Sequence, residues 1–137
     1  MRRSHTITLQ IERPYAAVYQ FLADPRNFAQ WAAVDSASFV PIGDGTQDWR
    51  AMTPGGLRHY RFTPINAFGV LDHALFAPGE VPMFTPMRVF ANEEGTELMF
   101  TFFRRAGMTD EEFDSTIEWI TTDFLTLKSV LEAWPRR

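Results

Sequence analysis

One apolar stripe near the C-terminus constrains the fold of this chain more than any other feature. Large apolar side chains recur there at spacings of four and three residues, in the order Phe113, Ile117, Ile120, Phe124, Leu127, Leu131 and Trp134. This period predicts one amphipathic helix over residues 109–134, about 39 Å long. Because the stripe covers only one side, we expect the helix to lie along a sheet and not within a helical bundle.

The predicted helix has a recognisable signal at each end. Thr109 and Glu112 form a capping box, in which the Thr109 hydroxyl accepts from the Glu112 amide and the Glu112 carboxylate reaches back. Pro135 ends the apolar pattern, because a proline cannot continue a helix.

The N-terminal part of the chain predicts a strand and two short helices. Residues 7–11 alternate between apolar and polar side chains, which is the period of a half-buried strand. A helix then begins at Pro14 and ends at Asp24. A second short helix begins at Pro25, with Asp24 as its cap, and ends near Trp31.

Six short runs rich in aromatic and β-branched residues follow, separated by turn signals. They are residues 36–42, 47–53, 57–63, 69–77, 83–91 and 96–105. Such runs are too short for stable helices, so we predict an antiparallel meander of six strands. The chain is then one α+β domain over residues 1–137, with a curved antiparallel sheet of about seven strands around the long helix. A sheet that curls further than the helix can fill leaves an internal cavity.

The composition indicates which side chains line that cavity and which classes of partner are disfavoured. Thirteen Phe, four Trp and three Tyr must either fill the interior or line a space within it. The formal charge of -4 and the pI near 5.3 disfavour nucleic acid, because phosphate binding needs clustered cations. No apolar run near the N-terminus suits a signal peptide or a membrane span, so we expect a cytoplasmic protein.

The sequence offers little for a metal or a cofactor. It contains no cysteine, which excludes thiol nucleophiles and cysteine-ligated metals. The three histidines, His5, His59 and His73, show no helical ligand spacing and no accompanying carboxylate cluster. We therefore expect neither a metal ion nor a cofactor.

Asp72 and His73 are adjacent in the sequence, and an acid beside a histidine suggests a catalytic pair. Successive side chains of a strand point to opposite faces, so the two cannot act on one substrate. We favour the parity that turns His73 inward together with Leu71 and Leu75, because an isolated buried carboxylate costs more than a neutral imidazole. Asp72 then faces outward, where it could pair with Arg88 of the next strand.

His73 keeps two interpretations at this point. It is either a core histidine bonded to a backbone carbonyl or a polar group in an apolar cavity that contacts a ligand or moves a proton. Tyr60 and Arg58 share one face of their predicted strand. Arg58 is expected at the rim of the cavity, and an inward Arg58 could bind a carboxylate or an enolate oxygen.

These features together resemble a known superfamily, the START-like or SRPBCC group (Bet v 1-like, helix-grip). The resemblance is carried by ITLQIERPYAAVYQFLADPRNFAQWA at residues 7–32, by the meander, and by the long helix from residue 109. FGVLDH at residues 68–73 is similar to a small bacterial subgroup of polyketide cyclase or dehydrase type. The resemblance implies a helix-grip fold with an internal hydrophobic cavity. It implies no reaction, and no catalytic residue is carried over from it.

Three hypotheses of function follow. The first is binding of a hydrophobic or aromatic small molecule, a lipid included, with His73 or Arg58 orienting it and walls made by Trp31, Tyr60, Leu71, Met87, Phe102 and Ile120. An alternative is an enzyme of the cyclase or dehydrase type that uses His73 as acid and base, with Arg58 or Tyr60 stabilising enolate charge. A second alternative is an interaction or homodimerisation module without a ligand, which needs a collapsed cavity and an exposed apolar patch.

Overall fold

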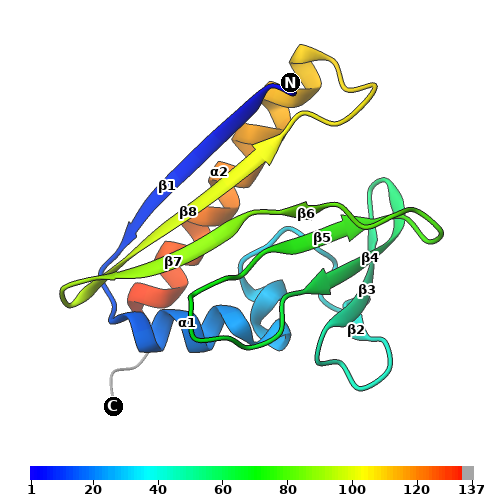
Figure 1. Ribbon diagram of the computed structural model, residues 1–137. Helices are drawn as coiled ribbons and strands as arrows, with labels where there is room; N and C mark the ends of the chain where they lie inside the picture. Colours follow the sequence, from blue (N-terminus) through cyan, green and yellow to red (C-terminus); the bar gives the residue numbers. More distant parts are fainter. Residues whose placement is uncertain (134–137) are drawn as a thin grey trace.

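The described part of the chain forms two antiparallel sheets with helices packed against them (Figure 1). The structure is a computed structural model that describes residues 1–133, so Trp134 and Pro135 of the predicted stripe and its stop lie outside the described residues. In chain order the elements are β1 (Ser4–Ile11), α1 (Tyr15–Ala23), the 3-10 helix η1 (Pro25–Gln30), β2 (Val40–Pro41), β3 (Asp48–Thr53), β4 (Gly56–Phe62), β5 (His73–Phe76), β6 (Phe84–Thr85), β7 (Met87–Asn92), β8 (Gly95–Phe103) and α2 (Asp110–Ala133).

The predicted fold class and order of elements are confirmed. The predicted caps are present as well: the Glu112 amide donates to Thr109 Oγ1 at 3.1 Å, and the Thr109 amide donates to Glu112 Oε1 at 3.4 Å. Asp24 Oδ1 accepts from the Arg26 amide at 3.0 Å and so caps η1. Local signals therefore fix where these helices begin.

The meander differs from the prediction in the bounds of its strands. The predicted runs 36–42 and 69–77 form strands only at β2 and β5, and one further run is divided. The predicted strand over residues 83–91 is divided into β6 and β7 at Pro86. Proline has no amide hydrogen to donate, so the ladder that it would continue is interrupted. As a result β6 ends the sheet of order β2-β3-β4-β5-β6, whereas β7 belongs to the sheet of order β1-β8-β7.

The segment just before β5 joins the two sheets. Val70 forms a bridge to Arg88, the Leu71 amide donates to the Met87 carbonyl at 2.8 Å, and the Val89 amide donates to the Gly69 carbonyl at 3.0 Å. After Asp72 this segment separates from β7 and continues as β5 in the second sheet. Backbone pairing is thus carried from one sheet to the other, and the two sheets form one curved surface around α2.

Asp72 secures this junction from its outer side, as predicted. Its carboxylate accepts from Arg88 Nε and Nη2, each at 2.9 Å, and from the Met87 amide at 2.8 Å. Partial burial acts to raise the pKa of Asp72, but these hydrogen bonds outweigh it and hold the pKa below its usual value. Leu71, Met87 and Val89 point inward and are buried.

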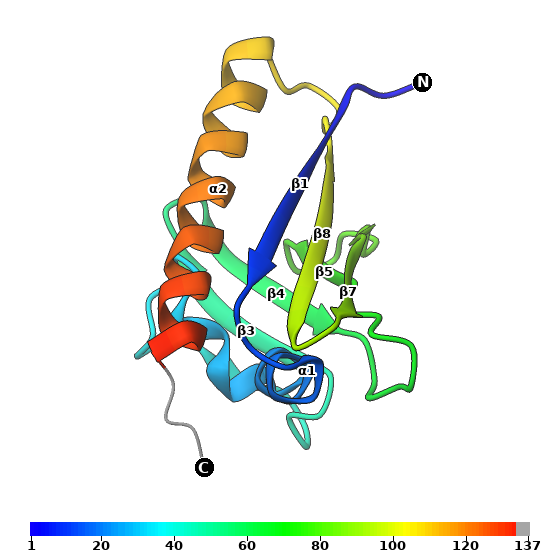
Figure 2. The same cartoon turned by 90° about the vertical axis from the view of Figure 1, so that its left-hand side faces the viewer.

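Helix α2 lies along β1, and α1 packs beside β7 and β8 (Figure 2). The ends of the apolar stripe are buried at Phe113 and at Phe124, Leu127 and Leu131. Ile120, in the middle, stays only partly buried. The helix therefore does not fill the concave side of the sheets along its whole length. Within residues 1–133, none of the helices is both long and apolar enough to cross a membrane.

We expect Gly69→Ala to damage the junction of the sheets. Gly69 has a φ of +68°, and a Cβ there would overlap the Val89 carbonyl oxygen. Backbone strain and overlap together should lower the free energy of unfolding by about 3 kcal/mol or more, measured by urea denaturation. Gly79→Ala is the matched control, because Gly79 has a φ of +87° but no atom near its Cβ position. Its cost should be about 1 to 2 kcal/mol. Equal losses in the two variants would show that β7 yields easily and that the junction is not a constraint.

Candidate functional site

A cavity of about 320 Å³ lies between α2, η1 and the inner faces of β4, β5 and β8. Most of its surface is aromatic or aliphatic, with a few polar groups among the rings. The side chains on which the site depends are those of Phe28, Trp31, Arg58, Tyr60, His73, Leu75, Phe100, Phe102, Arg105, Trp119, Ile120, Asp123 and Phe124. The size is at the lower end of the range for small-molecule sites, about 300 to 1,000 Å³.

The structure brings six of the eight predicted site residues to this cavity. They come from η1 and its end, from β4, β5 and β8, and from α2: Trp31, Arg58, Tyr60, His73, Phe102 and Ile120. Trp31 is stacked on Phe124 with the ring centroids 5.5 Å apart, so it closes one side of the space. Arg58 lies at the rim, as expected, with its Nη1 donating to the Leu57 carbonyl at 2.9 Å.

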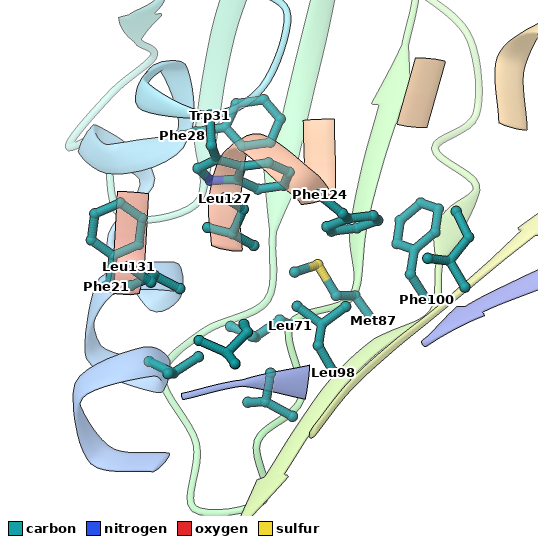
Figure 3. Close-up of a cluster of buried hydrophobic side chains, with 14 of the residues drawn as sticks. Phe21, Phe28, Trp31, Leu71, Met87, Leu98, Phe100, Phe124, Leu127 and Leu131 are labelled. Atoms are coloured by element: carbon teal, nitrogen blue, oxygen red, sulfur yellow. The ribbon is translucent and has the colours of Figure 1, made fainter. Parts of the chain in front are cut away.

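Leu71 and Met87, which were predicted as walls, do not line the cavity. Both lie in the buried core, where Figure 3 shows them beside Leu98 and Leu127. Their inward parity was predicted correctly. However, they sit at the junction of the sheets, where the interior is filled by packed side chains, and alternation along a strand sets the face of a residue but not its depth.

His73 combines the two interpretations that its sequence context allowed. Its Nδ1 lies 3.3 Å from the Leu71 carbonyl oxygen, and because a carbonyl only accepts, Nδ1 carries the hydrogen of the neutral ring. The ring lies among Phe28, Phe62 and Phe100, with centroid distances of 5.9, 6.0 and 6.1 Å. No residue of the described range bonds to Nε2, and the ring borders the cavity. Nε2 is therefore left as an acceptor that none of the described residues uses.

The electrostatics of the site keep His73 neutral and Tyr60 protonated. Burial lowers the pKa of His73, although the Leu71 carbonyl and the Asp72 charge act to raise it. Burial also raises the pKa of Tyr60 to about 12, against a lowering effect of Arg58. At neutral pH His73 Nε2 is thus a hydrogen-bond acceptor and the Tyr60 hydroxyl a donor, beside the threonines and charged residues that also line the cavity.

Two charged residues of the cavity escaped the sequence analysis. Arg105 was not among the predicted site residues, yet it lines the cavity, and its partial burial is the main cause that lowers its pKa. Strand β8 ends at Phe103, so the alternation of side chains along a strand does not predict where Arg105 points. Asp123 accepts from the Ala33 amide at 3.3 Å, and partial burial raises its pKa. Its position three residues after Ile120 on one helix face was the available signal.

Phe100 and Trp119, which were not among the predicted site residues, also line the cavity. Trp119 keeps half of its surface exposed, which places it at the opening. Among residues 1–133, no group of three His, Cys, Asp or Glu side chains is arranged to hold a metal ion.

Comparison with known proteins identifies the fold but no sequence relative. No protein-family model matches the chain, and no curated protein matches its sequence. Among solved structures, the Aha1 dimer from Colwellia psychrerythraea matches with a TM-score of 0.71 and 16% identity, over 96% of this chain and 97% of that chain. Ara h 8.0201 matches with a TM-score of 0.63 and 13% identity, over 94% and 98%. DynU16, a protein of the dynemicin biosynthetic locus, matches with a TM-score of 0.68 and 16% identity, over 95% of this chain but 47% of that chain. At such identities the similarity shows a Bet v 1-like, SRPBCC-type fold and no more.

We expect His73 to make the stability of the protein depend on pH. In the unfolded chain its pKa is near 6.5, and in the folded protein it is lower. As pH falls below the unfolded value, the unfolded state binds a proton that the folded state rejects, so the free energy of unfolding decreases. Between about pH 7.5 and about pH 5.5, urea denaturation should show a steeper loss in the wild type than in His73→Gln, by up to about 1.4 kcal/mol per pH unit. Parallel curves for the two proteins would contradict a buried neutral His73.

Proposed function

We propose that this protein binds a hydrophobic or aromatic small molecule in its internal cavity, as a member of the SRPBCC superfamily. The observation that carries the proposal is an aromatic-lined space of about 320 Å³ whose wall contains a neutral histidine with a free acceptor nitrogen. Such a combination of apolar walls and a few directed polar groups is typical of ligand sites.

The walls would supply affinity and the polar groups orientation. Trp31, Phe102 and Ile120 offer apolar surface, and burial of a ligand against such walls is worth about 25 cal/mol per Å² before the costs of association. His73 Nε2 would accept a hydrogen bond from a ligand hydroxyl, and the Tyr60 hydroxyl would donate one to a ligand carbonyl. A ligand with both groups would be held in one orientation.

An enzyme of the cyclase or dehydrase type is the second candidate, and one observation favours it. A neutral imidazole that faces a cavity is equipped to take up a proton, and the Tyr60 hydroxyl borders the same cavity and could donate to a developing enolate oxygen. The similarity to DynU16, a protein of a biosynthetic locus, is compatible with such chemistry.

The third candidate, an interaction module without a ligand, receives less support. It needs a collapsed cavity, whereas the space beside α2 is open. The Aha1 dimer shows that a protein of this fold can form dimers, and a homodimer and a cytoplasmic location stay predictions for this chain.

The binding proposal predicts that ligands raise the melting temperature through the cavity. We would test aromatic polyketides, flavonoids and fatty acids, and expect one class to raise Tm by about 5 to 10 °C at about 100 times its Kd. Ile120→Trp should abolish the rise, because the larger side chain occupies the cavity from α2. Leu125→Trp is the matched control: Leu125 lies on the same helix but is 55% exposed and does not line the cavity. No rise for any class near its solubility limit would refute the binding proposal.

A second test separates binding from catalysis. The compound class that raises Tm would be incubated with the protein and followed by mass spectrometry. For a binding protein we expect the compound to be recovered unchanged and His73→Gln to weaken its affinity only. Turnover by the wild type that His73→Gln removes, with binding retained, would instead establish the enzyme.

A further inference from the structure

Two arginines of the cavity, Arg58 and Arg105, form no ion pair with a carboxylate of the described residues, although the charge of Glu80 acts on Arg105. Arg58 Nη1 donates to the Leu57 carbonyl at 2.9 Å, and Arg105 Nη1 donates to the Leu75 carbonyl at 3.4 Å. Neither forms an ion pair with any residue of the described range 1–133. Each guanidinium carries five N–H groups, so most of their donors stay available.

This lack of ion pairs does not follow from a shortage of acids. Arg2 and Arg50 also form no ion pair among the described residues, but they do not line the cavity. The chain has 17 acidic residues against 13 basic ones. Other cations of the protein are paired with carboxylates: Arg3, Arg26, Arg61, Arg88, Arg104 and Lys128. The cavity of a protein that is negative overall therefore has two arginines in its lining, neither of them in an ion pair with a described residue.

The two guanidinium groups act on the same region. Partial burial is the main cause that lowers the pKa of Arg105, and the positive charges of Arg2 and Arg58 lower it further, while Glu80 raises it. An anion placed between Arg58 and Arg105 would relieve their repulsion and replace water lost on burial. Asp123 lines the cavity too, but it forms no ion pair with either arginine among the described residues.

The guanidinium of Arg58 lies against the turn between β3 and β4. Thr53 Oγ1 donates to the Gly56 carbonyl at 2.8 Å and closes this turn. Gly55 packs so closely on Arg58 that a Cβ at Gly55 would lie 2.9 Å from Arg58 Nη2. Arg58 therefore lies beside the turn residues Thr53, Pro54 and Gly55, which line the same cavity.

We propose that the ligand of this cavity carries a carboxylate, which Arg58 and Arg105 bind while the apolar or aromatic body of the ligand fills the ring-lined space. The inference rests on the proposed binding function and adds the chemical class of the ligand. Guanidinium groups match carboxylates in shape and charge. Because Glu80 already offsets part of the charge of Arg105, the single charge of a carboxylate suits the site better than the double charge of a phosphate monoester.

The test compares 2-naphthoate with 2-naphthamide, which has nearly the same shape but no charge, by isothermal titration calorimetry. The wild type should bind the carboxylate about tenfold more tightly, the usual gain from charge-assisted hydrogen bonds. In the double variant Arg58→Gln, Arg105→Gln this preference should vanish, while the affinity for the amide stays the same. Arg50→Gln is the control, because Arg50 is exposed on β3 and lies outside the cavity, so it should keep the preference.

A comparison that needs no variant protects the test against loss of folding. In the wild type, added salt should weaken binding of the carboxylate and leave that of the amide unchanged. Equal affinities for the two probes, or a double variant that binds both as the wild type does, would overturn the inference and leave the proposed function standing. If neither probe binds but a neutral compound raises Tm, the inference is likewise overturned and the proposed function stands. If no compound binds at all, the inference and the proposed function fail together.

Discussion

The backbone pairing between residues 69–72 and β7 is the constraint on which the rest of the structure depends. It holds the end of one sheet against the other, so the curvature around α2 is set by hydrogen bonds and not by side-chain packing alone. Gly69 permits the close approach, and the carboxylate of Asp72 locks it by binding Arg88 and the Met87 amide. β5 and His73 stay paired with β4 and β6, so this segment sets how the second sheet lies against the first.

The cavity follows from a mismatch between this curved surface and a straight helix. The C-terminal part of the α2 stripe, from Phe124 to Leu131, packs into the core with Trp31, Leu98 and Met87 (Figure 3). Ile120 lies where the sheets have diverged from the helix, and the space there stays open. The polar groups around that space include an acceptor at His73, a donor at Tyr60, the cations Arg58 and Arg105 and the carboxylate of Asp123. The fold alone specifies none of this chemistry, which rests on individual side chains.

Sequence reasoning succeeded wherever short-range rules apply. The capping box at Thr109, the cap at Asp24, the inward parity of His73 and the outward pair of Asp72 with Arg88 each depend on neighbours in the chain or on an adjacent strand. It failed where the outcome depends on how deeply a residue is buried or on where a strand changes sheet. Leu71 and Met87 have the predicted parity but lie in the packed core, and the predicted strand over residues 83–91 divides at a proline.

By itself, the sequence determined the order of elements, the single long helix and the ring-rich character of the interior, because periodicity, caps and composition are properties of the chain. Only the tertiary structure decided which rings border empty space and which charges meet there. Arg58 and Arg105 are 47 positions apart and become neighbours of one cavity because the β3–β4 turn and the loop after β8 converge on it. No rule based on neighbouring residues predicts that these two arginines line one cavity, because this depends on how the sheets curve around α2.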